Sequence, residues 1–237
     1  MTAYAPDDRV MVSPRYMAGA GDRLADAIGP LIHLFSWTTQ HDAATGHVKI
    51  DSPNGSVFCD FDPLHPRGTW WTIAHHEPYW EVQFSRQTPM EAVAAVTQAL
   101  PQLLGDHRHA ERIPITDMPL DQIAALNNWT VEDGALTSPD WYCQLLHTPD
   151  EEVAWRAEHV FYEKQPLATF TRDVPEALVR NFFAHLATPT AVQRTFADVP
   201  FSTRYEHGHL ITPVRGAVIS PPFDHALAQL DRPGRSR

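Results

Sequence analysis

Histidines are the first candidates for chemistry, because the sequence contains 14 of them and some occur in short pairs. The pairs are His75 with His76, His107 with His109, and His207 with His209. A zinc or related metal site needs three or four ligands that converge on one point. These pairs fall in a predicted strand, a polar linker and the C-terminal segment, with no spacing that joins them. We therefore predict no metal site.

Nucleophilic and phosphate-binding motifs are missing as well. The sequence has no G-x-S-x-G elbow, no G-x-G-x-x-G and no Walker-type loop. Cys59 and Cys143 lie in apolar, alternating stretches, where burial disfavours the reactive thiolate. Asp60 and Asp62 form a close carboxylate pair, but an acidic strand that discourages sheet aggregation explains them equally well. We expect a protein that is not an enzyme and has no cofactor.

Two arginines occupy equivalent places in a repeated stretch. The tripeptide FSR at 84–86 recurs as FTR at 170–172, and Pro89 recurs as Pro175, each 86 positions later. A fixed offset of this size indicates one supersecondary unit that occurs twice. Arg86 and Arg172 would therefore lie at the same corner of each unit. At such a corner an arginine can cap a strand end, pair with a nearby acid or contact a phosphate.

Each copy has the pattern of four strands followed by a helix. Apolar residues alternate over 47–50, 57–61, 70–76 and 79–85 in the first copy, and strands are predicted over 129–133, 141–148, 153–160 and 166–172 in the second. The helix of the first copy begins at Pro89, where Thr88 and Glu91 have the form of a capping box. One four-stranded sheet with one helix buries little apolar surface by itself, which explains the second copy.

These patterns divide the chain into five parts. Residues 1–23 form a lead-in, and 24–104 form the first repeat, which includes a short helical segment before Trp37. Residues 105–115 are a polar linker, and 116–195 form the second repeat. Residues 196–237 depart from the repeat, and we expect this C-terminal extension to be partly mobile.

Composition and charge limit the function classes. A chain of 237 residues with 43% hydrophobic residues can bury a sizeable core, and no run approaches the roughly 18 apolar residues of a membrane span. The first residues lack a signal-peptide pattern, so we expect a cytoplasmic protein with no membrane contact. The formal net charge of −11 repels polyanions unless the basic residues gather on one face.

The repeated motifs resemble the SPDY domain, an actinobacterial family of unknown function that often occurs in tandem. The resemblance rests on SPNG and SPDW after a Trp-led strand, on WWTIAHH, and on the closing stretch WEVQFSRQTPMEAV. The lead-in SPRYMAGAGD is also similar to that family. The resemblance implies a Streptomyces-like source, often a plasmid, phage or other mobile element, and it brings no catalytic residue.

The layout of two ββββα units about a pseudo-twofold axis also resembles the Whirly-type proteins that bind single-stranded DNA. We therefore predict an α+β protein of two tandem ββββα repeats, Whirly-like, packed about such an axis. The resemblance implies base stacking on exposed aromatic rings and phosphate contacts from cations. The candidate nucleic-acid-binding residues are Lys49, Trp70, Tyr79, Arg86, Arg156, Tyr162, Lys164 and Arg172.

Two functions follow as hypotheses. The first is a non-enzymatic protein that binds nucleic acid, with single-stranded DNA as the favoured partner. The alternative is a protein-interaction or scaffold module whose acidic surface engages a basic partner, and either could form a homo-oligomer. Arg86, Arg156, Lys164 and Arg172 on one concave face would favour nucleic acid, whereas scattered cations would favour a protein partner.

Overall fold

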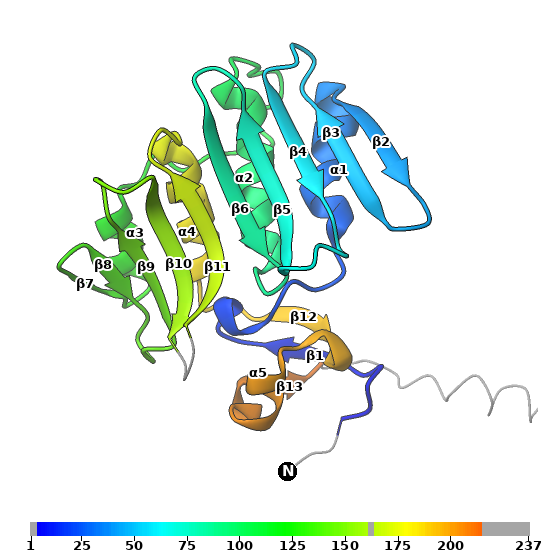
Figure 1. Cartoon of the computed structure of the whole chain (residues 1–237). Helices are drawn as coiled ribbons and strands as arrows, with labels where there is room; N and C mark the ends of the chain where they lie inside the picture. Colours follow the sequence, from blue (N-terminus) through cyan, green and yellow to red (C-terminus); the bar gives the residue numbers. More distant parts are fainter. Residues whose placement is uncertain (1–3, 161–163, 215–237) are drawn as a thin grey trace, which may run out of the picture.

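The computed structural model describes residues 4–160 and 164–214, and its largest element is a ten-stranded antiparallel sheet (Figure 1). The first repeat contains α1 (Leu24–Phe35), β2 (Thr38–Asp42), β3 (His47–Asp51), β4 (Val57–Phe61), β5 (Thr69–His75), β6 (Trp80–Ser85) and α2 (Met90–Leu103). The second contains α3 (Leu120–Leu126), β7 (Thr130–Glu132), β8 (Ala135–Thr137), β9 (Cys143–His147), β10 (Val153–Val160), β11 (Lys164–Thr171) and α4 (Glu176–Ala187). The fold is α+β with tandem repeats, as the sequence predicts.

Each repeat contributes five strands, so the predicted number of four is wrong. In the first repeat the added strand is β2, which precedes the four stretches in which the sequence predicts strands. All five of its residues are exposed at the edge of the sheet, so they show no apolar alternation. In the second repeat the added strand is β8, whose three residues are too few to establish a period.

The two half-sheets join at one antiparallel pairing, between β6 and β11. The strand order is β2-β3-β4-β5-β6-β11-β10-β9-β8-β7, so the second repeat follows the first in reverse order. In the register of this seam Gln83 pairs with Thr169, its equivalent at the offset of 86, and Phe84 pairs with Ala168 while Val82 pairs with Phe170. Equivalent residues thus exchange partners across the seam, which is the pairing that a local twofold axis requires.

The helices cover one face of this sheet and leave the other face open (Figure 1). Alternating strand residues point into the covered face, including Trp71, Phe84 and Phe170, each at most 1% exposed. Phe182 of α4 stacks on Phe84 with ring centroids 5.6 Å apart and also contacts Phe170. The core is therefore continuous across the seam. Among the described residues no helix is long and apolar enough to cross a bilayer.

A second, three-stranded sheet lies beside the repeats. Its order is β12 (Val192–Thr195), β1 (Arg9–Val12) and β13 (Ile211–Pro213), all antiparallel. Between these strands run the 3-10 turns η1 (Arg15–Met17), η2 (Phe196–Asp198) and η3 (Gly208–Leu210) and the short helix α5 (Phe201–Tyr205). The sheet thus combines the predicted lead-in, the end of the second repeat and the start of the extension. Residues 215–237 of that extension lie outside the described residues.

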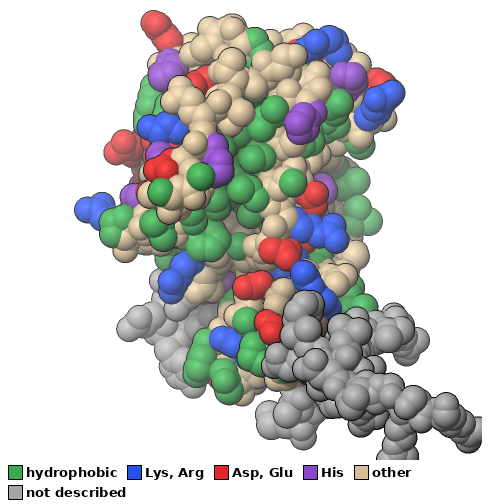
Figure 2. Space-filling view, turned by 90° about the vertical axis from the view of Figure 1, so that its right-hand side faces the viewer, with side chains coloured by type: hydrophobic (Ala, Val, Ile, Leu, Met, Phe, Trp, Pro, Cys, Tyr) green, Lys and Arg blue, Asp and Glu red, His purple; other side chains and the backbone are tan. Residues whose placement is uncertain are grey.

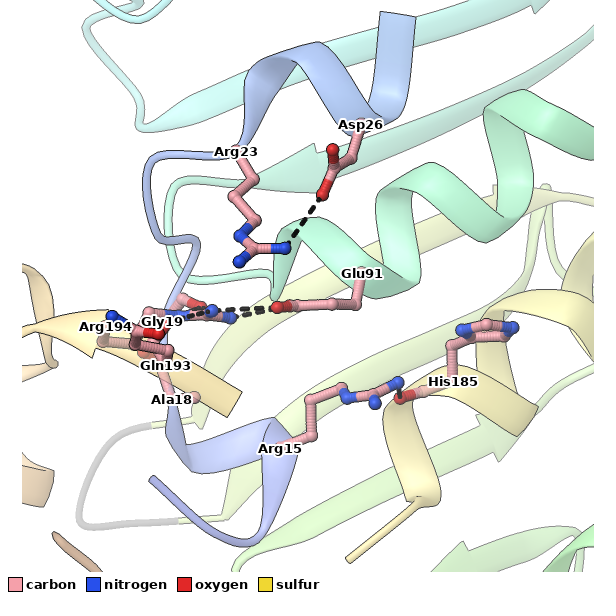
Figure 3. Close-up of polar contacts among 9 residues, drawn as sticks. All are labelled: Arg15, Ala18, Gly19, Arg23, Asp26, Glu91, His185, Gln193 and Arg194. Carbon is pink, nitrogen blue, oxygen red and sulfur yellow. Dashed lines mark hydrogen bonds and ion pairs between the residues drawn. The ribbon is translucent and has the colours of Figure 1, made fainter. Parts of the chain in front are cut away.

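A buried ion pair connects this small sheet to the first repeat (Figure 3). Arg194 of β12 is 1% exposed, and its two terminal nitrogens donate to the two carboxylate oxygens of Glu91 at 2.8 and 2.6 Å. The guanidinium also donates to the carbonyls of Ala18 and Gly19. Gly21 has a φ of +73°, and a Cβ there would approach Arg194 to 2.8 Å, so the close approach requires glycine.

The predicted capping box at the start of α2 is wrong, and the ion pair between Glu91 and Arg194 is part of the reason. Glu91 reaches Arg194 instead of the helix start, and the Thr88 hydroxyl donates to the carbonyl of Leu167. Pro89 is the N-cap residue and no side chain caps the helix. The long-range partners of Thr88 and Glu91 therefore replace the local pairing that their spacing suggests.

We predict that Glu91→Gln lowers the free energy of unfolding by about 3 kcal/mol, because it leaves the buried Arg194 without a carboxylate. Chemical denaturation at pH 7 measures the loss. Glu176→Gln is the matched control, since Glu176 forms an exposed pair with Arg180 at 3.3 Å and should cost less than about 0.5 kcal/mol. Equal losses for the two variants would contradict the role of the buried pair.

The same pair predicts a pH dependence. Burial raises the pKa of Glu91, but the hydrogen bonds and charge of Arg194 outweigh burial and lower it below the ordinary value. Because the pKa of Glu91 is lower in the folded state, the ionised carboxylate stabilises the fold at pH values above its unfolded-state pKa of about 4.3. This stabilisation is lost as the pH falls through the lower folded-state pKa. The stability difference between the wild type and Glu91→Gln should therefore shrink below pH 4, as denaturation at several pH values would show. A constant difference would count against the charged pair.

Candidate nucleic-acid interface

The open face of the sheet carries one continuous row of cross-strand neighbours. The register of each strand pair connects Gln40, Lys49, Asp60, Thr72, Gln83, Thr169, Arg156, Leu146, Ala135 and Glu132. Each of these residues is partly or fully exposed, whereas neighbours such as Ile73 and Val82 are buried against the helices. The middle of the row, around the seam, is polar and uncharged.

Lys49 and Arg156, both predicted to bind nucleic acid, lie in this row and are exposed. They are separated by five strand-to-strand steps, from β3 to β10, which corresponds to roughly 24 Å. Lys49 lies opposite Asp60 in the register of β3 and β4, and Asp60 accepts a hydrogen bond from His47. The two cations therefore share a face but do not form one cluster.

Trp70 and Arg86 lie together in a pocket of about 480 Å³ at one end of the seam. The β4–β5 loop completes its lining, with Leu64, His65 and Arg67 among the loop residues. The backbone N–H of Arg86 donates to the carbonyl of Gly68 at 2.8 Å, which holds the loop against the strand end. We call this the Trp70 pocket.

The lining of the Trp70 pocket is basic and aromatic. Arg67 and Arg86 are both exposed, and no carboxylate lines the pocket. In the part of the chain that the structure describes, neither arginine forms an ion pair. Their positive charge is thus available to an anion from solution. In a chain of net charge −11, such a site is a local exception.

A bulge in β5 sets the position of Trp70. Thr69 pairs with Ser85 and Trp71 pairs with Phe84, so the register shifts at Trp70. Bulges commonly redirect a side chain out of the regular pleat. Trp71 is buried in the core, whereas Trp70 is partly exposed and contacts Phe61 edge to face at 6.0 Å. One part of the Trp70 ring is therefore held by the core while the rest lines the pocket.

The equivalent corner of the second repeat has a different lining. Tyr79, from the β5–β6 hairpin, and Arg172 share a pocket of about 290 Å³ with Glu152 and Asp173. The N–H of Arg172 donates to the carbonyl of Glu152, as that of Arg86 does to Gly68. Tyr79 is 59% exposed and its hydroxyl donates to Glu81. The geometry repeats, but two carboxylates replace the basic lining.

Two of the predicted residues, Tyr162 and Lys164, remain. Tyr162 is outside the described residues. Lys164 begins β11 and pairs with Val160 through the backbone.

The predicted cations whose side chains the structure describes do not gather on one concave face. Arg86 and Arg172 lie at opposite ends of the seam, because β6 and β11 run antiparallel, and Arg156 lies near its middle. Charges of both signs are also interspersed on the side of the molecule that carries β2 and α1 (Figure 2). The clustering that would favour nucleic acid is thus limited to Arg86 with Arg67, a residue that we did not predict.

The sequence contains little that would identify Arg67. It lies in an irregular loop, PLHPRG, and the corresponding β9–β10 loop of the second repeat, TPDEE, is shorter and has no basic residue. Its proximity to Arg86 depends on the pairing of β4, β5 and β6, which brings the loop back to the strand end. The available signal is that Arg67 directly precedes a glycine, Gly68, in a loop near the repeated corner.

The described parts of the chain contain no metal-binding cluster and no exposed thiol. No three His, Cys, Asp or Glu side chains there lie close enough together to hold a metal ion. Cys59 and Cys143 are both buried, and burial raises the pKa of each thiol, with nearby carboxylates adding to the effect. Neither sulfur is placed to act as a nucleophile.

The fold and its two corners define a class, an antiparallel α+β protein built from two tandem units of strands followed by a helix. The family model described as SPDY, domain of unknown function (DUF317), matches residues 51–102 and 137–192, once in each repeat. Residues 51–102 and 137–192 thus each match the SPDY model, in tandem, which confirms the predicted resemblance to that family over these two segments. No curated protein and no solved structure matches the chain.

We predict that the two thiols do not react in the native protein. Ellman's reagent at pH 8 should modify neither Cys59 nor Cys143 over minutes, because both sulfurs are buried and their pKa values are raised. In guanidinium chloride both should react within the same time. Rapid reaction of one thiol in the native state would show that its strand opens or that the thiolate is stabilised.

Proposed function

We propose that this protein binds single-stranded nucleic acid, with DNA as the favoured partner, and that the Trp70 pocket is the main contact. One observation carries the proposal. Trp70 lies beside Arg67 and Arg86 in a pocket whose lining contains no carboxylate. An aromatic ring beside unpaired guanidinium groups matches the two components of a nucleotide, a flat base and a phosphate.

The size and partial burial of the pocket fit a single nucleotide. Its volume of about 480 Å³ accommodates a base with its sugar and phosphate. The contact with Phe61 keeps the Trp70 ring from rotating freely, so stacking costs little additional side-chain entropy. A base stacked on a fixed aromatic ring is worth about 1–3 kcal/mol.

The open face offers a path beyond the pocket. Thr72, Gln83 and Thr169 form the polar centre of the row, and Arg156 follows them. Hydroxyl and amide groups can hydrogen bond to the Watson–Crick edges of bases, which only an unpaired strand presents. Two related half-sheets with one open face also support the Whirly-like arrangement, which we include in this proposal as an analogy of layout.

The net charge restricts the mode of binding. Charges beyond a Debye length of about 8 Å are largely screened at physiological salt, so the pocket contacts outweigh the distant acids only for a phosphate that enters it. A stiff duplex would bring more phosphates near those acids than a flexible strand does. We therefore expect modest affinity and a preference for single strands.

Fluorescence anisotropy of labelled single-stranded and duplex oligonucleotides over a salt series tests this proposal. Trp70→Ala should weaken single-strand binding about tenfold, because one stacking contact is lost. Arg86→Gln should also weaken binding and should reduce the slope of log affinity against log salt by about 0.7, the value for one phosphate on a single strand.

The matched control is Arg172→Gln, which changes the equivalent corner of the second repeat. Because Glu152 and Asp173 line that corner, we expect its affinity and salt slope to equal those of the wild type. Absence of binding at low salt would overturn the proposal and favour a basic protein partner. Equal losses for Arg86→Gln and Arg172→Gln would show that binding is electrostatic but does not use the Trp70 pocket.

A further inference from the structure

The helix layer contains a second pocket, on the side of the sheet opposite the open face. Its volume is about 560 Å³, and its lining comes from α1, α2, α4, the 3-10 turn η1 and the segment 112–115. We call it the helix-layer pocket. It shares no residue with the Trp70 pocket, so its role is independent of nucleic-acid binding.

Small side chains on α2 create this space. Ala94, Ala95 and Ala99 line the pocket from the middle helix of the layer. At the repeat offset of 86 their equivalents on α4 are Arg180, Asn181 and His185, which are large and polar. The helix layer thus departs from the twofold symmetry of the sheet at this place, and the missing volume remains as a cavity. Ile113 and Ile115 of the linker add an apolar wall.

Arg15 supplies a positive charge at one end of the pocket. Figure 3 shows it beside His185 of α4, with Glu91 of α2 near by. One terminal nitrogen of Arg15 donates to the carbonyl of His185 at 2.8 Å, and its Nε is buried without a hydrogen-bond partner. In the described part of the chain Arg15 forms no ion pair. A half-buried cation in this state is stabilised by an anion.

The acids of the lining are already neutralised by cations outside it. Glu91 pairs with Arg194, and Asp26 pairs with Arg23 at 3.6 Å. Burial lowers the pKa of Arg15, as does Arg194, whereas Glu91 raises it. Burial and Arg15 also lower the pKa of His185, so this ring is neutral at pH 7. Arg112, the other cation of the lining, pairs with Glu111 at 3.7 Å, so Arg15 is the lining cation that has no ion pair among the described residues.

We propose that the helix-layer pocket binds a small monocarboxylate, with its carboxylate at Arg15 and its apolar body against the three alanines and the two isoleucines. A ligand with a single negative charge fits better than a phosphate dianion, because Arg15 offers one positive charge and Arg23 and Arg194 are already paired with Asp26 and Glu91. The apolar wall excludes a fully hydrated inorganic anion.

Titration of the full chain with three probes of equal length tests the proposal. The probes are sodium hexanoate, 1-hexanol and hexylammonium chloride, followed by the backbone amide NMR signals of Ala95, Ile113 and Asn181. Hexanoate should shift these signals with saturation, at least tenfold more tightly than hexanol, and hexylammonium should not bind. Equal responses to the three probes, or hexanoate shifts that do not saturate, would overturn the proposal.

Two variants locate the site. Arg15→Gln should weaken hexanoate at least tenfold and leave hexanol unchanged, whereas Ala95→Leu should fill the pocket and weaken both. Arg180→Gln is the control, because Arg180 is on the same helix as His185 but does not line the pocket. Unchanged hexanoate affinity in both Arg15→Gln and Ala95→Leu would place binding elsewhere. The probe series on the wild type decides the question if a variant fails to fold.

Discussion

The antiparallel pairing of β6 with β11 is the constraint on which the rest of the structure depends. It converts two five-stranded units into one sheet and aligns Gln83 with its own equivalent, Thr169. The same pairing brings α2 and α4 together on the covered face, so that Phe182 can pack on Phe84. It also places the β5–β6 hairpin of the first repeat beside the strand-to-helix corner of the second, where Tyr79 and Arg172 line one pocket. Without this seam neither half would bury its apolar face.

Both binding sites that we propose depend on differences between equivalent positions of the two repeats. The sheet is nearly symmetric, but Arg86 faces a basic loop while Arg172 faces Glu152 and Asp173. The helices differ in the same way, with alanines on α2 where α4 has larger polar side chains. A duplicated unit must keep the residues of its seam and core, because both copies need them. Its corners and outer helix faces are free of that requirement and can acquire separate binding roles.

The parts that could be predicted from the sequence are those governed by local periodicity. The inner strands, both repeat helices and the burial of Trp71 follow from alternation and from the 86-residue offset. Edge strand β2 could not be predicted, because an exposed strand has no apolar alternation. Pairing between segments far apart in the sequence could not be predicted either. It brings Arg67 to Arg86, and it directs Glu91 to Arg194 although the local spacing favours a helix cap.

The buried Arg194–Glu91 pair explains why the domain boundaries of the sequence do not coincide with structural units. A bidentate pair in low dielectric is stable only when both partners are held rigidly and their remaining hydrogen bonds are satisfied. Arg194 meets this condition because it donates hydrogen bonds to the carbonyls of Ala18 and Gly19 in the lead-in and to the carboxylate of Glu91 on α2. Three segments far apart in sequence must therefore be present together before any of them is stable in this arrangement. The lead-in and the start of the extension are then parts of the fold of the first repeat, and Arg15, which belongs to the same lead-in, is held at the helix-layer pocket by that assembly.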